Sequence, residues 1–151
     1  METKTYDIEA LLAAGQTVQF PPQGWSMYPL LSDGRDQVIV APAEGRQLRR
    51  GDVALYRRDG DILVLHRIWR VEKESLWFVG DNQRQVEGPL GRDQVRGVMT
   101  AVIRNGKHIS VTDPRYRLLS RLWLTARPLR PALSRSAAAL KRIYYTMFHK
   151  P

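Results

Sequence analysis

The distribution of apolar and polar residues along the chain changes twice and divides it into three parts. Residues 1–16 contain one short stretch with apolar residues at helical spacing. Residues 17–112 contain short runs rich in β-branched and aromatic residues, separated by Gly, Pro, Asp and Asn, which is typical of strands joined by turns. In residues 113–151 the apolar positions again recur every three or four residues, which predicts helix.

The N-terminal part predicts a short helix over residues 6–14. Asp7 is placed to cap its first turn, and Gly15 is placed to end it. The apolar stripe that would face the rest of the protein consists of Ile8, Leu11 and Leu12.

The middle part predicts a mainly β domain. Its expected strands are Thr17–Phe20, Gln37–Val40, Asp52–Arg57, Ile62–Val71, Leu76–Val79, Val95–Arg104 and His108–Val111. Tight turns are expected at Arg58–Asp61 and at Asn105-Gly106, because Asp-Gly and Asn-Gly pairs tolerate positive φ. Short strands joined by tight turns favour an antiparallel sheet.

The C-terminal part predicts a basic amphipathic helical tail. After Pro114, one helix face carries Leu118, Leu119, Leu122 and Trp123, and a second apolar stripe runs from Leu133 to Met147. Residues 1–103 contain 13 Lys and Arg against 14 Asp and Glu, whereas residues 104–151 contain 11 Lys and Arg and one acidic residue. The net charge of +9 therefore belongs to the C-terminal third of the chain, which indicates a surface-binding segment.

Two interpretations of this tail follow from its pattern. Residues 115–148 place Trp123, Leu140, Tyr144 and Phe148 opposite arginines and lysines, an arrangement that suits an anionic membrane surface. Alternatively, the apolar face packs on the β domain and the charges are solvated. We expect no nucleic-acid partner, because no recognisable nucleic-acid-binding module accompanies the charge.

Composition excludes several kinds of site. The chain has no cysteine, and therefore neither disulfides nor a thiolate nucleophile. Its three histidines, His66, His108 and His149, lack metal-ligand spacing, and no glycine-rich phosphate loop is present. We expect no metal and no cofactor. The sequence shows neither a basic signal-peptide segment nor an uncharged run near the ~20 residues that span a bilayer, so we expect a cytoplasmic or peripheral membrane protein.

Residues 24–31, the Ser26 segment, read Gly-Trp-Ser-Met-Tyr-Pro-Leu-Leu. Ser26 follows a predicted strand and precedes Pro29, which restrains the turn and can hold backbone amides in a fixed direction. A serine nucleophile needs a base to take its proton and donors to stabilise an oxyanion. A serine in a proline-containing turn is usually only a turn residue, so this segment alone does not predict catalysis.

A histidine and two carboxylates are candidates to assist such a serine. His66 lies in an apolar predicted strand, where an isolated histidine is usually a half-buried structural residue, but its neutral imidazole can act as a base near pH 7. Residues 80–82, the Gly-Asp-Asn turn, contain Asp81, and Glu87 follows six positions later. Either carboxylate could orient the imidazole.

The order of these segments resembles the S24/S26 peptidase superfamily, which contains type I signal peptidases and self-cleaving LexA-like repressors. The matching pattern is G-x-S-M-x-P-x-L, G-D-V, V-x-H-R-[IV], G-D-N and a late [VI]-x-G-x-[VM], and it covers roughly residues 17–104. The resemblance implies that Ser26 is the nucleophile and that His66 is the base, as in the endoplasmic-reticulum and archaeal branch. It further implies an acidic third member at Glu87, where the family usually has Asp, and matches Asp81 to the family's other acidic position.

The resemblance also implies a coiled antiparallel sheet of the signal peptidase and LexA-like type, and an endopeptidase that cleaves signal- or leader-peptide-like substrates. The amides of Ser26 and Met27 would form the oxyanion hole. Substrate contacts would come from Trp25, Met27, Tyr28 and Pro29. The sequence departs from signal peptidases in lacking their N-terminal membrane anchor. The alternative is a catalytically inactive peptide-binding module, or a membrane-associated regulator, with the same fold.

Overall fold

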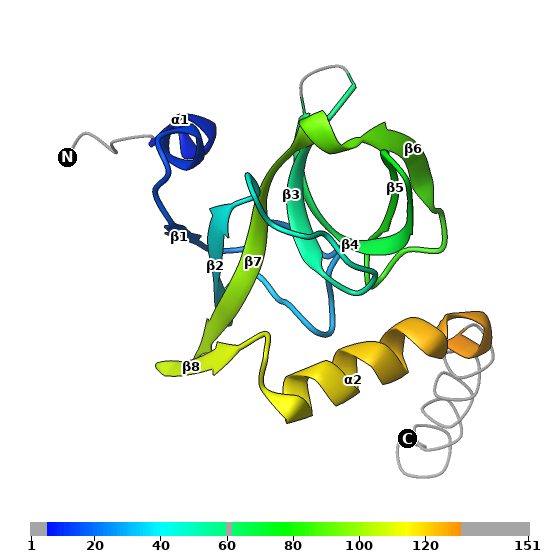
Figure 1. The fold of residues 1–151 in the computed structure, drawn as a ribbon. Helices are drawn as coiled ribbons and strands as arrows, with labels where there is room; N and C mark the ends of the chain where they lie inside the picture. The colour runs from blue at the N-terminus through cyan, green and yellow to red at the C-terminus, as the bar shows by residue number, and fades with distance from the viewer. Residues whose placement is uncertain (1–5, 60–61, 131–151) are drawn as a thin grey trace, which may run out of the picture.

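A curled antiparallel sheet forms most of the computed structural model, which describes residues 6–59 and 62–130 (Figure 1). Its strands are β1 (Val18–Phe20), β2 (Asp36–Pro42), β3 (Val53–Arg58), β4 (Ile62–Glu72), β5 (Ser75–Val79), β6 (Glu87–Gly91), β7 (Val95–Arg104) and β8 (Lys107–Ser110). The helices are α1 (Ile8–Ala13) and α2 (Pro114–Thr125), with short 3-10 turns η1 (Arg92–Gln94) and η2 (Arg127–Leu129). The expected mainly β, antiparallel class is therefore confirmed.

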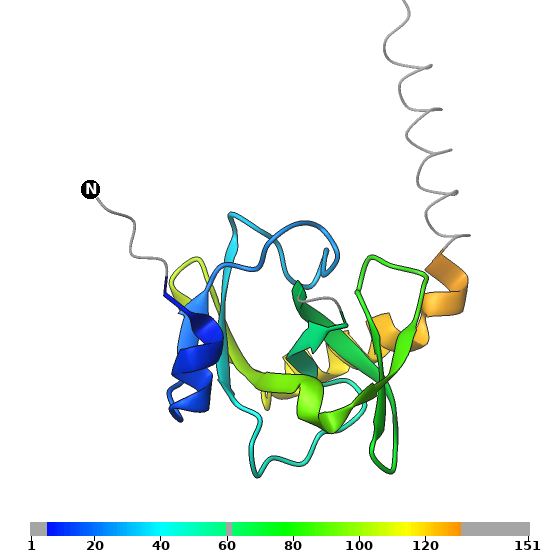
Figure 2. The same ribbon diagram turned by 90° about the horizontal axis from the view of Figure 1, so that it is seen from above.

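The sheet curls into a half-barrel because its later strands are bulged. The strand order is β1-β2-β7-β3-β4-β5-β6, and β8 pairs with β7. Pairing shifts register between Ile68 and Arg70 of β4, and again between Leu76 and Phe78 of β5. Such bulges bend a strand and increase its twist, so β3 to β6 wrap around on themselves (Figures 1 and 2).

The curl produces two hydrophobic cores, one on each face of β4. The first core lies under α1 and is built by residues of α1, β1, β2, β3 and β7 together with Met27 and Leu31. The second core fills the inside of the curl between β3 and β6. Because side chains alternate along a strand, Leu63 and Leu65 of β4 pack on the first core, whereas Val64 and Ile68 pack on the second.

Strand β6 was not expected from the sequence. It reads Glu-Gly-Pro-Leu-Gly, and glycine and proline both disfavour strand. It forms because β5 supplies an antiparallel partner on one side, and it remains at the edge of the sheet, where a proline is tolerated. The missed strand determines where Glu87, a candidate site residue, lies, since β6 begins at that residue.

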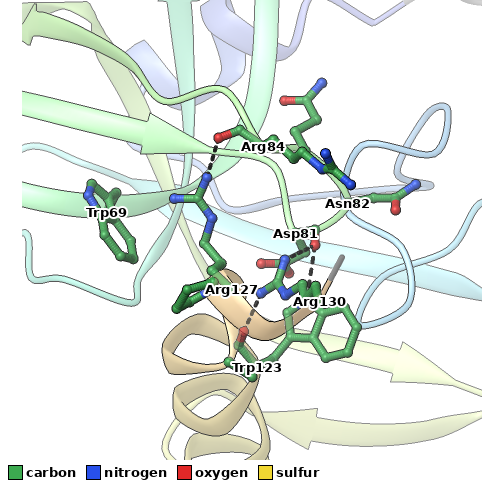
Figure 3. A pocket seen from close by; sticks show the side chains of 10 residues that line it. Trp69, Asp81, Asn82, Arg84, Trp123, Arg127 and Arg130 are labelled. Carbon is green, nitrogen blue, oxygen red and sulfur yellow. Dashed lines mark hydrogen bonds between the residues drawn. The ribbon is translucent and has the colours of Figure 1, made fainter. Parts of the chain in front are cut away.

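Helix α2 begins at Pro114, as the sequence predicts, and Asp113 caps it by accepting from the Arg115 amide at 2.8 Å. Trp123 faces the sheet and its Nε1 donates to the Asp81 carbonyl at 2.9 Å, so the end of α2 lies against the Gly-Asp-Asn turn (Figure 3).

Within the described residues, no helix is long and apolar enough to cross a membrane. Residues 131–151 of the predicted tail, and residues 60–61 of the turn after β3, lie outside the described residues.

Candidate active site

The Ser26 segment forms the turn that follows β1. Ser26 is partly buried, and Met27 is 4% exposed because it packs into the first core. Trp25 and Tyr28 are exposed and meet edge to face, with ring centroids 5.6 Å apart. The segment therefore has an anchored side, at Met27, and an aromatic side that faces outward.

The Gly-Asp-Asn turn supports the serine directly. The Asn82 amide donates to the Ser26 carbonyl at 2.8 Å. Gly80 passes so close that a Cβ on it would lie 2.6 Å from the same carbonyl oxygen, a distance that real Cβ atoms do not tolerate. Glycine at position 80 is thus required by the approach of Ser26, and the first and fourth matching sequence segments are in contact.

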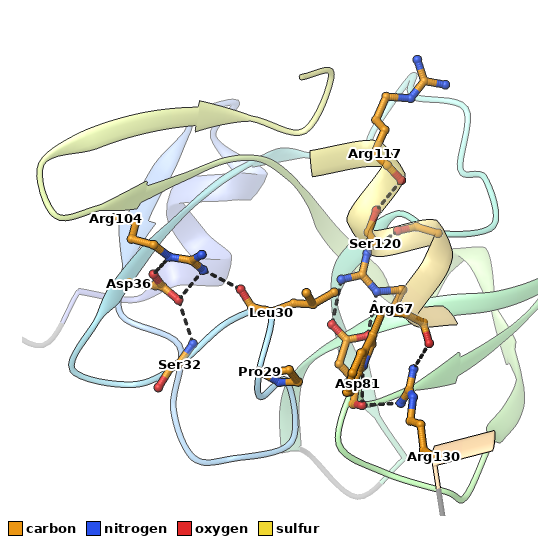
Figure 4. Close-up of polar contacts among 12 residues, drawn as sticks. Pro29, Leu30, Ser32, Asp36, Arg67, Asp81, Arg104, Arg117, Ser120 and Arg130 are labelled. Atoms are coloured by element: carbon orange, nitrogen blue, oxygen red, sulfur yellow. Dashed lines mark hydrogen bonds and ion pairs between the residues drawn. The ribbon is translucent and has the colours of Figure 1, made fainter. Parts of the chain in front are cut away.

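A buried carboxylate holds the chain beyond the Ser26 segment. Asp36 accepts from the Ser32 amide at 2.9 Å and from Arg104 Nε at 2.7 Å, and Arg104 also donates to the Leu30 carbonyl at 2.7 Å (Figure 4). Burial opposes ionisation of Asp36, but hydrogen bonds from Arg104 and Arg35 outweigh it and hold its pKa below the usual value. This network fixes the chain between Leu30 and β2.

Asp81 is engaged by Arg67 rather than by His66. Arg67 Nε and Nη2 donate to the two Asp81 carboxylate oxygens at 2.8 and 2.7 Å, and both side chains are completely buried (Figure 4). Arg67 Nη1 also donates to the Gly51 carbonyl at 2.8 Å. Since both Asp81 oxygens pair with one guanidinium, this carboxylate positions the backbone of the site and does not orient the imidazole.

His66 is linked to the other predicted carboxylate through a tyrosine. Its side chain is 4% exposed and lies on the face of β4 that it shares with Val64. Tyr56 Oη lies 3.2 Å from His66 Nδ1 and donates to Glu87 Oε2 at 2.8 Å. The three groups form a chain from β4 through β3 to β6.

This chain fixes the imidazole tautomer. The ionised Glu87 carboxylate can only accept hydrogen bonds, so the single hydroxyl proton of Tyr56 must point to it. The Tyr56 oxygen can then only accept from His66, which requires the proton on Nδ1. Nε2 consequently carries the lone pair, which is the arrangement that a general base needs.

Burial and charge around this chain favour a neutral imidazole. Burial lowers the pKa of His66 to about 4, although the nearby Glu87 carboxylate opposes the shift. Hydrogen bonds from Arg58, at 2.6 and 2.8 Å, lower the pKa of Glu87. Burial and the Glu87 carboxylate raise the pKa of Tyr56 well above its usual value. At neutral pH the chain therefore contains an ionised glutamate, a protonated tyrosine and a neutral histidine.

Ser26 approaches β4 from one side and the Gly-Asp-Asn turn from the other. Ser26 and residues 63–65 of β4 line one cavity of about 330 Å³. Leu63 and Leu65 of this lining face the first core, whereas His66 lies with Val64 on the opposite face of β4. On the other side, Ser26 rests on Gly80, and the preceding Val79 pairs with Arg67. In the described part of the chain, no hydrogen bond joins Ser26 to His66, and the amides of Ser26 and Met27 donate none.

The apolar cavity beside Ser26 is lined by residues from four secondary-structure elements and from the loop that carries the serine. These are Ile8 of α1, Phe20 of β1, Leu55 of β3, residues 63–65 of β4, and Pro21, Pro22, Gln23 and Met27 near the serine. Of the predicted substrate contacts, Met27 lines this cavity, whereas the Pro29 carbonyl is engaged by Arg35 at 2.9 Å.

Sequence reasoning missed Tyr56, although a signal for it exists. In an antiparallel pair, residues two positions from directly opposed partners share a face. Ala54 opposes His66, so Tyr56 lies diagonally across from it on the same face. To derive that register from the sequence, one must know which residues form the hairpin turn between β3 and β4.

A scan of protein-family models and searches of the curated proteins and the solved structures find no match to this chain. Functional interpretation therefore depends on the residues and contacts of this site. Among the residues that the structure describes, no group of three or more His, Asp or Glu side chains could hold a metal ion.

Proposed function

We propose that this protein is a serine endopeptidase of the signal-peptidase class, in which Ser26 is the nucleophile and His66 the general base. The observation that supports this proposal most directly is the hydrogen-bonded chain from Glu87 through Tyr56 to His66. This chain leaves the lone pair of His66 Nε2 without a protein partner among the described residues. Contact between the Ser26 segment and the Gly-Asp-Asn turn supports the same assignment. Asp81 serves as a positioning residue.

In the proposed reaction, Ser26 Oγ attacks a peptide carbonyl carbon and its proton passes to His66 Nε2. The C–N bond then breaks, and the imidazolium returns the proton to the leaving amine. Water hydrolyses the acyl-serine by the same path in reverse. Ser26 and His66 close to hydrogen-bond distance when substrate binds, since catalytic hydrogen bonds are often long in unbound enzymes.

The amides of Ser26 and Met27 are the proposed oxyanion donors. Neither donates a hydrogen bond within the described residues, and removal of one such donor typically costs about 3–4 kcal/mol of transition-state stabilisation.

The cavity beside Ser26 accepts an apolar side chain of the substrate. β1 is an edge strand and its Phe20 lines that cavity, so an extended substrate would add to the sheet beside β1.

Cleavage of signal-peptide-like sequences by the full chain tests this function, with products identified by mass spectrometry. We expect Ser26→Ala and His66→Ala each to lower the rate at least ~10³-fold. Ser32→Ala is the matched control, because its hydroxyl contacts only the Asp33 carbonyl at 3.2 Å. Wild-type turnover by either active-site variant would refute the assignment, whereas no turnover by the wild type would favour an inactive peptide-binding module.

A second candidate activity is attachment to an anionic membrane through α2. Leu118, Leu119 and Leu122 were expected on one face with Trp123, but the structure turns Trp123 to the sheet and leaves the three leucines 61%, 52% and 57% exposed. Exposed arginines flank these leucines at positions 115, 117 and 121. An outward apolar face beside cations suits an anionic lipid surface.

Co-sedimentation with vesicles of increasing anionic lipid content tests this attachment. Replacing the three leucines with glutamine should reduce binding and change the free energy of unfolding little, since each leucine is more than half exposed. Ile62→Gln removes an equally exposed apolar residue of β4 (56% exposed) and should leave vesicle binding unchanged. Equal binding by the triple variant would exclude α2 as the attachment site.

A further inference from the structure

A second cavity, of about 780 Å³, lies behind the Gly-Asp-Asn turn and is independent of the peptidase site (Figure 3). We call it the arginine cavity. It is enclosed by Trp69 of β4, the turn from Asp81 to Arg84, and the end of α2 with η2, namely Trp123, Ala126, Arg127, Pro128 and Arg130.

Three guanidinium groups line the arginine cavity, and none has a carboxylate partner among the described residues. Arg127 donates to the Arg84 carbonyl, and Arg130 donates to the carbonyls of Asp81 and Trp123 (Figure 3). These carbonyls orient the guanidiniums but leave their positive charge uncompensated. The one carboxylate in the lining, that of Asp81, is already bound on both oxygens by Arg67.

Burial makes this charge costly. Arg127 and Arg130 are both partly buried, and Arg130 Nε is fully buried without a hydrogen-bond partner. Burial lowers the pKa of each of these arginines below its usual value, and for Arg130 the charge of Asp81 opposes this shift only in part. Arg127 and Arg130 also lie over the rings of Trp69 and Trp123, at 4.8 and 4.2 Å from the ring centroids, which holds them in place.

We propose that the arginine cavity binds a phosphate group, supplied either by a soluble phosphate ester or by a phospholipid headgroup. A phosphate carries a charge of about −1.5 to −2 and three acceptor oxygens, which matches a cavity lined by three guanidiniums better than a single carboxylate does. Arginine is favoured for such contacts because its planar fork donates two parallel hydrogen bonds.

Phosphate bound in the arginine cavity would affect the Gly-Asp-Asn turn, because that turn forms one wall of the cavity. The backbone carbonyl of Asp81 accepts from Trp123 and Arg130 on the cavity side, and the next residue, Asn82, donates to Ser26 on the other side. A phosphate bound to Arg130 would therefore fix the turn on which Ser26 rests.

Isothermal titration of the full chain with inorganic phosphate, at constant ionic strength, tests the proposal, and chloride serves as the blank. Arg127→Gln and Arg130→Gln should each weaken phosphate binding about tenfold or more, because each removes a charge-assisted donor. Arg46→Gln removes the same charge from an exposed residue outside the cavity and should leave binding unchanged. Thermal unfolding of each variant without phosphate reports whether it still folds.

A parallel titration distinguishes the two sources of phosphate. Phosphatidylcholine vesicles with and without phosphatidic acid should bind the wild type differently, and Arg127→Gln should remove that difference if a headgroup is the ligand. Binding of free phosphate alone indicates a soluble ester. The proposal is overturned if folded protein binds neither probe, or if Arg46→Gln weakens binding as much as the two cavity variants do. The Ser26→Ala variant should bind as the wild type does, so the outcome is separate from that of the peptidase assay.

Discussion

His66 is buried on the inside of the curl, where its only described hydrogen bond is to Tyr56. Burial there suppresses its charged form, and the Tyr56–Glu87 chain determines which nitrogen carries the proton. These two effects serve a base differently. Burial keeps the imidazole neutral at pH 7, and the hydrogen-bonded chain places its lone pair on Nε2.

The depressed pKa of His66 predicts how stability changes with pH. The unfolded chain binds a proton at a histidine pKa of 6.5, whereas the folded protein does so only at about 4. Stability associated with this residue is therefore complete above pH 6.5 and declines as the pH falls toward 4, by up to about 3 kcal/mol. Urea unfolding at pH 7 and pH 4 should show a larger loss in the wild type than in His66→Gln, in which only groups such as Glu87 and Asp36 still contribute. An equal loss in both proteins would contradict the shift.

Tyr56 provides a more specific test of the chain. Tyr56→Phe leaves the ring that stacks on Phe78, 4.0 Å between centroids, but removes the acceptor of His66 Nδ1. We expect kcat for peptide cleavage to fall about tenfold or more, since the imidazole loses its orientation. Tyr6→Phe, at an exposed tyrosine outside the site (68% exposed), is the control and should keep its rate. Unchanged kcat in Tyr56→Phe would exclude Tyr56 from the mechanism.

Among the secondary-structure elements, β4 and the Gly-Asp-Asn turn organise the site. The strands with regular alternation could be predicted from the sequence, because a half-buried strand imposes a period of two. β6 could not, because its glycines and proline obscure any period, and it forms only through pairing with β5. The Arg67–Asp81 pair also escaped prediction, since it joins residues whose proximity depends on the curl of the sheet.

The buried Arg67–Asp81 pair should dominate the stability of this region. Asp81→Asn leaves a buried guanidinium uncompensated and should cost about 3–5 kcal/mol of unfolding free energy. Glu72→Gln, which breaks the exposed pair with Arg70 at 3.3 Å, should cost less than about 0.5 kcal/mol. Urea denaturation of both variants makes the comparison. Similar small losses would show that Asp81 does not hold the turn.

Gly80 tests the contact between the turn and Ser26. Gly80→Ala places a Cβ against the Ser26 carbonyl, so the serine must shift, and a displacement of about 1 Å can cost ~10²-fold in rate. Gly91→Ala is the matched control, because its Cβ would meet only the mobile end of the Asp93 side chain. Peptide cleavage by the two variants should differ strongly. Equal rates would show that the position of Ser26 is not critical.

On the scale of the whole molecule, the proposed peptidase site lies in the nearly neutral β domain, and the proposed binding surfaces lie mainly in the basic C-terminal third. The peptidase candidate lies where the Ser26 segment meets β4 and the Gly-Asp-Asn turn. Exposed leucines and uncompensated arginines lie on α2 and η2 instead. The turn contacts both regions, through Asn82 on one side and Asp81 on the other.

The most direct test of the central claim is covalent labelling of the full chain with a fluorophosphonate, followed by peptide mapping. A fluorophosphonate reacts with a serine whose hydroxyl is activated by a neighbouring base. We predict a single adduct at Ser26, formed at least ~10²-fold more slowly in His66→Ala. An adduct on another residue, or labelling of Ser26 at the same rate without His66, would contradict the account.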